Sequence, residues 1–431
     1  MAQAVKVVDV ELGGPLTDIT GLERYGAVQG LVRLHGRPIG YVQLPLLKGR
    51  CSATALNDAI RREHGRAVQR ALLRQRLEAP PASEGTVVAE ELPRPVVTVA
   101  VCTRDRTESL RTCLDALLGL DYPAVDLLVI DNGPSSDASA RLVGQYAAVR
   151  YVREPRPGLD WARNRAIAEA RGEIIAYTDD DVVVDAGWAK ALAAVFADDP
   201  QVMAVTGLVV PYELETPAQL LFEAYGGFGR GFTRRWYRRD PTRGKTDRFH
   251  IGAGRFGTGA NMAYRRSLLE RLGGFDPALD VGTVTNGGGD LEMFFRVLQE
   301  GYTLVYEPAA VVRHRHRRDH AQLRTQLANN GIGLYSYFVR SALAYREMRV
   351  AVIRFALWWF WWWNLRRLLL SFVRPGGLPR DLIWAELFGV LKGLVRYPAA
   401  RRTAARIARM PQATEDTRAG TAGTETLESL P

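Results

Sequence analysis

Three consecutive carboxylates, Asp179, Asp180 and Asp181, follow an apolar run at residues 173–177. Three such groups repel one another unless a positive charge lies among them, and a divalent cation with oxygen ligands provides one. Mg²⁺ or Mn²⁺ held by few protein carboxylates shares its other positions with substrate phosphates. Carboxylates are also favoured at turns and helix starts, so a solvated acidic turn or helix cap is the alternative for an isolated triplet.

The elements that must position this triplet alternate between strands and helices. Strands are predicted at three apolar runs separated by helical stretches: residues 96–102, 127–130 and 173–177. This alternation predicts an α/β fold with a parallel sheet and right-handed crossovers. Ligands of such sheets bind beyond the carboxyl ends of the strands, and Asp105, Asp131 and Asp179 all fall at those ends.

The composition is that of a globular protein with an anionic partner. The chain has 431 residues, 47% of them hydrophobic and 24% charged, and a net charge of +10. A nucleotide diphosphate, a nucleic acid or acidic lipid headgroups would each suit this charge. No recognised nucleic-acid-binding motif is present, so we expect no nucleic-acid partner. The three cysteines lack paired spacing and residues 1–13 lack a signal-peptide pattern, which fits a reducing compartment.

Several motifs, taken in order, resemble those of family two of the nucleotide-sugar glycosyltransferases. The resemblance covers roughly residues 96–326 and is carried by these segments: 101–106 and 129–133 after the first two strands, 158–164, the Asp-x-Asp segment 175–181, the acceptor-side strand 259–266, and the catalytic-base segment 288–292. It implies a GT-A fold, in which a mostly parallel sheet is flanked by helices. The motif set is more specific than any one of its members.

The resemblance implies a role for each matching position. Asp181 would hold a Mg²⁺ or Mn²⁺ ion that bridges the two phosphates of the donor, and Asp179 would approach the ribose or the same ion. Four more residues would contact or line the site of the nucleotide-sugar donor: Thr103, Asp105, Asp131 and Arg163. The implied reaction is a metal-dependent hexosyl transfer that inverts the anomeric carbon in one displacement.

Asp290 would be the general base that takes the proton from an acceptor hydroxyl. A helix is predicted from Leu291, so Asp290 could cap its N-terminus, either instead of acting as the base or in addition, because a capping aspartate can also face a site. The sequence departs from the family pattern immediately before the base, where Gly289 stands in place of an acidic residue. Glu292 keeps a carboxylate two residues later. We place it with Asn261 on the acceptor side.

His314 lies in the basic run at residues 313–318. In related enzymes a histidine after the last core strands can reach the metal or the diphosphate, which makes His314 a candidate metal ligand. A solvated basic run is the alternative, because most such runs behave in that way.

The chain divides into five predicted segments. They are an accessory α+β domain at residues 1–78, a linker at 79–95, the glycosyltransferase domain at 96–348, membrane-interfacial amphipathic helices at 349–400 and a disordered polar tail at 401–431. Residues 31–34 and 39–44 predict a hairpin in the first segment. The Gly- and Arg-rich stretch at 226–259 is interpreted as a mobile loop over the site.

Residues 350–373 contain five tryptophans together with Arg354, Arg366 and Arg367. Tryptophan and arginine together favour an interfacial helix, with a buried interdomain helix and a spanning helix as alternatives. We therefore expect peripheral or monotopic association with the cytoplasmic face of a membrane, and a glycan or lipid-linked acceptor.

Two other functions remain as alternatives. A nucleotidyltransferase would carry a glycine-rich loop after the first strand, and residues 103–106 contain no glycine. A nucleotide-sugar-binding or membrane-scaffold protein without activity would lack the base or the metal motif, and both are present in this sequence.

Overall fold

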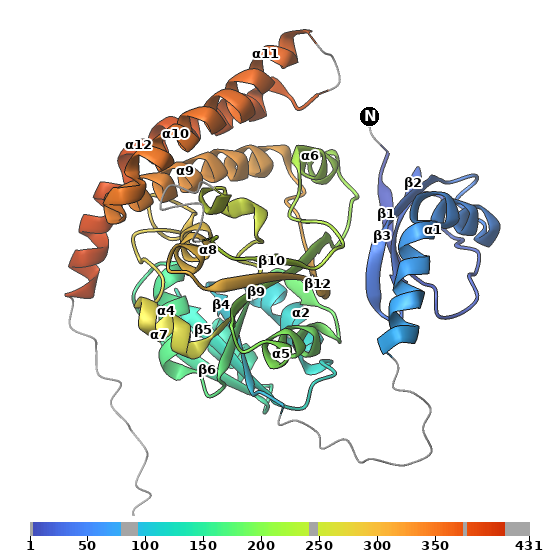
Figure 1. Ribbon diagram of the computed structural model, residues 1–431, viewed down its shortest axis with the longest axis horizontal. Helices are drawn as coiled ribbons and strands as arrows, with labels where there is room; N and C mark the ends of the chain where they lie inside the picture. Colours follow the sequence, from blue (N-terminus) through green and yellow to red (C-terminus); the bar gives the residue numbers. More distant parts are fainter. Residues whose placement is uncertain (1–2, 79–93, 241–248, 374–376, 410–431) are drawn as a thin grey trace, which may run out of the picture.

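The computed structural model describes residues 3–78, 94–240, 249–373 and 377–409 (Figure 1). A nine-stranded sheet lies at its centre, a small domain with its own three-stranded sheet lies beside it, and the last helices form an outer layer. The predicted linker is described only from residue 94. Residues 410–431 of the predicted tail lie outside the described residues.

One half of the central sheet is parallel. Four neighbouring strands make it up: β6 Val149–Glu154, β5 Val125–Asn132, β4 Val97–Thr103 and β7 Ile174–Asp179. Three helices connect them: α2 Thr107–Leu118, α3 Ala138–Val143 and α4 Leu159–Glu169. The strands predicted at 96–102, 127–130 and 173–177 are confirmed. Their carboxyl ends therefore share one edge, where Asp105, Asp131 and Asp179 lie.

The other half mixes strand directions. β11 Asn261–Arg265 runs antiparallel between β7 and β9 Val202–Pro211, and β12 Thr303–His314 lies parallel to β9. The short strands β8 Val182–Val184 and β10 Arg235–Tyr237 both pair antiparallel with β12. The expected α/β fold is confirmed, although parallel pairing is confined to part of the sheet. The mobile-loop interpretation of 226–259 is wrong for β10, because its backbone pairs with β12.

Five helices cover this half or follow it: α5 Trp188–Asp198, α6 Pro217–Tyr225, α7 Arg266–Leu272, α8 Gly289–Gln299 and α9 His320–Ala344. The start of α8 packs closely against α9 because glycines lie at the contact. A Cβ at Gly288 would lie 2.5 Å from the carbonyl oxygen of Gly333, so a side chain there would force the two backbones apart.

The N-terminal domain consists of β1 Val5–Glu11, β2 Ala27–Leu34, β3 Arg37–Pro45 and α1 Ala53–Glu78. The predicted hairpin is confirmed as β2 and β3, and β1 joins β2 in parallel. This domain contacts the larger one through a backbone bridge between Val5 and Leu214 and an ion pair of 2.8 Å between Arg33 and Asp185.

The C-terminal layer contains α10 Arg349–Trp359, the π-helical segment η5 Phe360–Leu365, α11 Arg366–Val373 and α12 Arg380–Ala408. It lies outside α9 (Figure 1), and a Cβ at Gly389 of α12 would lie 2.1 Å from the Ala328 carbonyl oxygen of α9. Because α12 continues to Ala408, residues 401–408 of the predicted polar tail are helical. Among the described residues, no helix is long and apolar enough to cross a membrane.

Candidate active site

The triplet and His314 meet because the chain doubles back after Asp181. Strand β8 begins at Val182 and pairs with β12, which sets Val182 opposite His314. As a result, ligand atoms of Asp179, Asp181 and His314 all lie within 4.8 Å of one another. Two carboxylates and one imidazole, from positions far apart in the sequence, thus form a set that could hold a divalent cation.

The imidazole of His314 is held with one nitrogen toward the carboxylates. Its Nε2 lies 3.5 Å from Asp181 Oδ1, and its Nδ1 lies 3.2 Å from Nδ1 of His316. His316 in turn lies 2.8 Å from Glu223 through its Nε2. Burial lowers the pKa of His314 to about 4, so the ring is neutral near pH 7, as a metal ligand must be. The alternative of a solvated basic run is wrong for both histidines, which are buried.

The pKa of Asp179 indicates that the protein side chains around it supply too little positive charge. Burial, followed by the negative charge of Asp181, raises its pKa to about 7. The protein side chains alone therefore leave Asp179 poorly compensated near neutral pH. A cation bound between Asp179 and Asp181 would remove this penalty, which agrees with the fit of two carboxylates and one imidazole to a divalent ion.

Asp180 has a different task from its neighbours. It accepts hydrogen bonds from the Thr103 hydroxyl at 2.7 Å and from Arg106 at 2.6 Å, and it is almost fully buried. Asp180 thereby ties the end of β4 to the end of β7. Thr103 was expected to line the nucleotide pocket, but its hydroxyl donates to Asp180 and only 3% of the residue is exposed.

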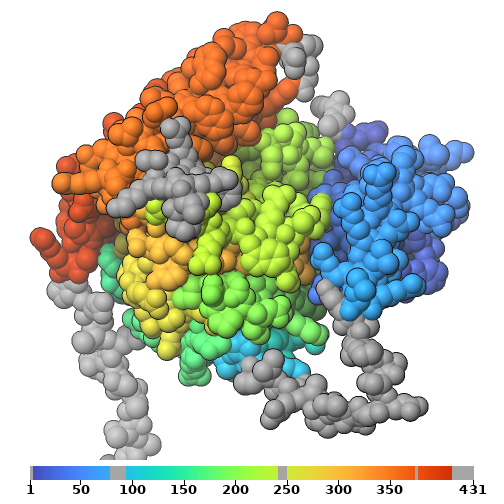
Figure 2. All heavy atoms as spheres, in the orientation of Figure 1, coloured from blue at the N-terminus to red at the C-terminus, as the bar shows by residue number. Residues whose placement is uncertain are grey.

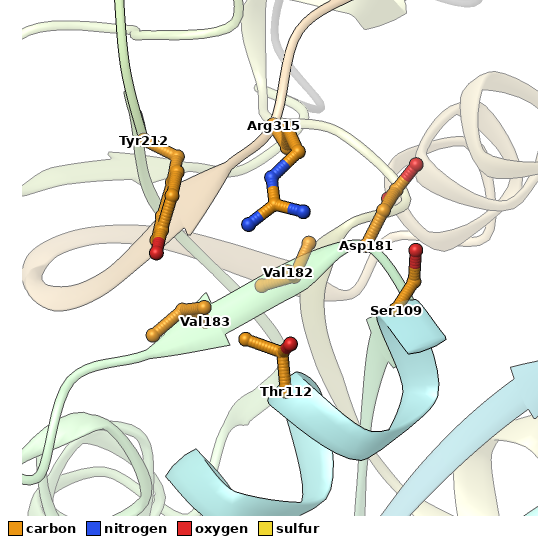
Figure 3. Close-up of a pocket in the computed structure, with 7 residues that line it drawn as sticks. All are labelled: Ser109, Thr112, Asp181, Val182, Val183, Tyr212 and Arg315. Atoms are coloured by element: carbon orange, nitrogen blue, oxygen red, sulfur yellow. The ribbon is translucent and has the colours of Figure 1, made fainter. Parts of the chain in front are cut away.

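Two arginines approach the metal set. Arg106 donates to Asp181 Oδ2 at 2.8 Å, and a guanidinium nitrogen of Arg317 lies 3.7 Å from the same oxygen. A small pocket lies beside them between α2, β8 and the end of β12. Figure 3 shows the Arg315 guanidinium between Tyr212 and Asp181, and it stacks on the Tyr212 ring at 4.7 Å. Guanidinium groups so placed can bind phosphate oxygens.

The two other aspartates at strand ends lie on the predicted nucleotide side. Asp105 accepts hydrogen bonds from the backbone N–H and the hydroxyl of Ser135, both at 2.9 Å, which joins the segments after β4 and β5. Asp131 is fully buried and accepts from the Tyr151 hydroxyl at 2.9 Å. Burial raises the pKa of Asp131. Their contacts with a nucleotide stay predictions.

Arg163 lies in the interior beside the predicted base. Its Nη1 donates to Asp160 at 2.9 Å and to Asp280 at 2.6 Å, and the residue is 4% exposed. Burial raises the pKa of both Asp179 and Asp290, and the positive charge of Arg163 opposes this rise. The structure thus makes Arg163 the shared counter-ion of several carboxylates, and its contact with the nucleotide stays a prediction.

Asp290 lies in the first turn of α8. Its Oδ1 accepts from the N–H of Leu291 and its Oδ2 accepts from the N–H of Gly259, both at 2.8 Å. The helix N-cap is Gly288, so the interpretation of Asp290 as the cap is wrong. Burial, followed by the negative charge of Asp280, raises the pKa of Asp290. The charge of Arg163 and the two N–H groups partly offset this rise. A raised pKa suits a carboxylate that must accept a proton.

The glycine before the base has a structural cause. A Cβ at Gly289 would lie 2.3 Å from Asp160 Oδ2 and 2.8 Å from Asp280 Oδ2. The space next to the base therefore already contains two carboxylates, which come from α4 and from the segment before α8. Acidic groups are present there even though the residue at 289 is not acidic.

The two residues predicted on the acceptor side lie elsewhere. Asn261 is fully buried, donates to the carbonyls of Leu208 and Ala310 and accepts from the Trp188 indole, so it joins core elements. Glu292 is also fully buried and pairs with Arg296 at 2.6 Å and Arg340 at 2.7 Å. A helix turns about 100° per residue, so Glu292 faces away from Asp290. Both acceptor-side assignments are corrected.

Sequence reasoning gave no role to four residues that shape this site: Arg106, Asp160, Asp280 and His316. Arg106 and Asp160 stand inside or beside motifs that were recognised, so their charge next to a strand end or a helix start was an available signal. His316 stands two residues after His314 in the same basic run, so its place in the sequence was also an available signal. Asp280 carries no such signal, because only the tertiary fold brings it to Arg163.

Comparisons with known proteins bear on the same part of the chain. Residues 98–273 match the family model described as Glycosyl transferase family 2. The chain is 26% identical over 234 residues to a pre-mycofactocin glycosyltransferase of Mycobacterium tuberculosis, which covers 54% of this chain and 44% of that protein. It is 29% identical over 244 residues to polypeptide N-acetylgalactosaminyltransferase 5 of Caenorhabditis elegans, covering 53% of this chain and 38% of that protein.

One similar solved structure is a mannosyltransferase from Pyrobaculum calidifontis in complex with GDP-Man and Mn²⁺. The sequence identity is 19%, the TM-score is 0.42, and the match covers 79% of this chain and 80% of that one. The chain spans less than half the length of the mycobacterial and nematode relatives.

Proposed function

Residues 98–273 belong to glycosyl transferase family 2, and from this premise we propose that the protein transfers a sugar from a nucleotide-diphosphate donor to an acceptor hydroxyl, with inversion at the anomeric carbon. The observation that carries the proposal is the meeting of Asp179, Asp181 and His314 at the sheet edge that also receives Asp105 and Asp131. This edge is where α/β sheets bind nucleotides.

The metal set would hold Mg²⁺ or Mn²⁺ through the carboxylates of Asp179 and Asp181 and Nε2 of His314. When bound, the ion would offset the negative charge that the diphosphate gains as it leaves. Arg106, Arg315 and Arg317 lie next to this set and are suited to bind phosphate oxygens.

Asp290 would act on the acceptor. As the acceptor oxygen forms its bond to the anomeric carbon, the bond from that carbon to the diphosphate oxygen breaks and the diphosphate keeps the electron pair. The hydroxyl proton passes to the Asp290 carboxylate, whose raised pKa favours acceptance. One displacement from the opposite face inverts the anomeric carbon. The backbone N–H groups of Gly259 and Leu291 fix the orientation of the carboxylate.

The test is a donor screen with Mn²⁺ or Mg²⁺ that measures nucleotide diphosphate release and identifies the product. We expect Asp290→Asn to lower kcat at least a hundredfold while donor binding is retained, since general-base catalysis contributes about 10²–10⁴-fold. Asp181→Asn should weaken both Mn²⁺ and donor binding. Asp115→Asn, on the exposed face of α2, is the matched control and should retain full activity.

Three results would contradict the proposal. Donor binding without turnover under any acceptor condition would favour a nucleotide-sugar-binding protein that lacks activity. Full transfer by Asp290→Asn would remove the base from the mechanism. A product with retained anomeric configuration would overturn the single displacement.

A further inference from the structure

We propose that the C-terminal layer docks the protein on an anionic lipid bilayer surface, with the apolar faces of α10–α11 and α12 inserted among the headgroups. This inference does not depend on the proposed sugar transfer. It rests on the exposure of apolar side chains, on the charges around them and on the length of the helices.

The first observation is an exposed apolar stripe on the segment from α10 to η5. Val350, Ile353, Leu357 and Trp361 follow one another at intervals of three or four residues, and all four are exposed, Trp361 to 55%. Such spacing places them on one helix face. The other side of the same helix carries the buried Ala351 and Val352. The helix is thus amphipathic with a face that nothing in the described chain covers.

The second observation is a matching stripe on α12. Trp384, Phe388, Leu391 and Val395 have the same spacing and are exposed, Val395 to 70%. More than half of the exposed large hydrophobic side chains among the described residues lie between 350 and 395. Figure 2 shows the α10–α12 layer as an outer ridge of the molecule. Exposed apolar patches of this extent mark interaction sites in soluble proteins.

The third observation is the charge of this layer, which selects the partner. Asp381 and Glu386 are the only acidic residues at positions 349–373 and 377–409, and each lies beside a basic group: His320 at 2.8 Å and Arg367 at 3.4 Å. Basic side chains such as Arg354 and Lys392 are exposed beside the stripes. Anionic headgroups complement this charge, at about 1 kcal/mol per basic residue near the surface.

The same charge argues against a second copy of the chain as the occupant, because two such faces would bring like charges together. A spanning segment does not fit either, since no described helix is long and apolar enough. Tryptophan beside arginine is typical of the headgroup region, and the Arg366 guanidinium lies 4.5 Å from the Trp362 ring centre. The cytoplasmic leaflet carries anionic lipids, and it is the surface that we propose.

The test is co-sedimentation of the full-length protein with vesicles of phosphatidylcholine and phosphatidylglycerol at 3:1, and with phosphatidylcholine alone. We expect binding to the anionic vesicles that weakens as salt is raised. Trp361→Glu should lower the partition coefficient roughly tenfold, because a charge replaces a ring at the insertion depth. Trp236→Glu is the matched control, since Trp236 is 57% exposed on the remote strand β10, and its partition should equal that of the wild type.

Two double variants, each of which removes two positive charges, test the electrostatic contribution to binding. Arg354→Gln/Lys392→Gln should lose binding to anionic vesicles. Arg61→Gln/Arg70→Gln, which removes two exposed charges from α1, should weaken that binding less. Circular dichroism verifies the fold of each variant. Wild-type protein that stays in the supernatant with anionic vesicles overturns the proposal. A second result would also overturn it: the wild type is a dimer in sedimentation velocity, and Trp361→Glu dissociates this dimer without changing vesicle binding.

Discussion

The three adjacent aspartates at the end of β7 have different contacts, because the strand ends at Asp179. Asp179 and Asp181 reach His314, whereas Asp180 accepts hydrogen bonds from Thr103 and Arg106. The middle carboxylate therefore fixes the backbone from which the outer two project. Arg106 bonds to both Asp180 and Asp181, so one guanidinium links this fixed position to the metal set.

The pH dependence of turnover is predicted by the neighbours of Asp290. Burial and Asp280 raise the pKa of Asp290, so the base is protonated at low pH and kcat/KM should rise with pH through a value above that of an ordinary aspartate. Asp280→Asn removes one negative charge and leaves Arg163 less compensated. Both effects favour ionised Asp290, so the rising limb should move to lower pH, by roughly one unit.

The measurement is the pH profile of kcat/KM for the wild type, Asp280→Asn and the control Asp115→Asn. A structural defect would lower the whole profile without moving its midpoint. A midpoint that stays in place, or one that moves to higher pH, would contradict the proposed influence of Asp280 on the base.

At the scale of elements, the sequence predicted where carboxylates lie but not which way every side chain faces. Apolar runs ending in acidic residues located the strand ends of β4, β5 and β7 correctly. Asn261 was misplaced because β11 inserts antiparallel between β7 and β9, a pairing that local sequence does not encode. Glu292 was misplaced because a helical start near 289 sets positions 290 and 292 on different faces.

The short strand β8 was beyond sequence reasoning for a similar reason. Three valines after an acidic triplet give no indication of the partner with which they pair. Their pairing with the end of β12 is a long-range contact, and it is this contact that brings His314 to Asp181. His314 could be nominated from its place in the sequence, but only the sheet register shows that it is buried and which nitrogen faces the carboxylate.

The close packing of α4 against the start of α8 leads to a test of Gly289. Gly289→Ala would place a methyl group 2.3 Å from Asp160 Oδ2, so α8 or the carboxylates must shift. We expect a loss of about 2 kcal/mol in the free energy of unfolding, within the usual range for overpacking, together with reduced kcat as Asp290 moves. Thermal denaturation and turnover measure the two effects.

Two variants make this result specific. Gly65→Ala, in α1 where a Cβ meets no atom within 4 Å, should be neutral or slightly stabilising. Asp160→Ala/Gly289→Ala should be less destabilised than the sum of its single variants, because the closest clash, with Asp160, is absent. Additive losses would show that the clash with Asp160 is not the reason for glycine at this position.

On the scale of the whole molecule, the N-terminal domain is connected to the metal set through two strands. Arg33 of β2 pairs with Asp185 at 2.8 Å, and Asp185 lies 3.6 Å from Arg313. Arg313 also pairs with Asp9 of β1, which closes a network of four charges across the interface. Asp185 directly follows β8 and Arg313 directly precedes His314, so this network holds the strands that carry both sides of the metal set.

Arg33→Gln tests whether this connection supports the site. Arg33 is 7% exposed, and its loss leaves Asp9 and Asp185 competing for Arg313 alone, so we expect a loss of about 2 kcal/mol at the interface. Hydrogen exchange should become faster in β1 and β2. Mn²⁺ affinity, measured by calorimetry, should also fall, because β8 and the end of β12 lose a shared restraint. The exposed Arg37→Gln of β3 should change neither quantity. Faster exchange with unchanged Mn²⁺ affinity would show that the N-terminal domain is held by this network without supporting the metal set.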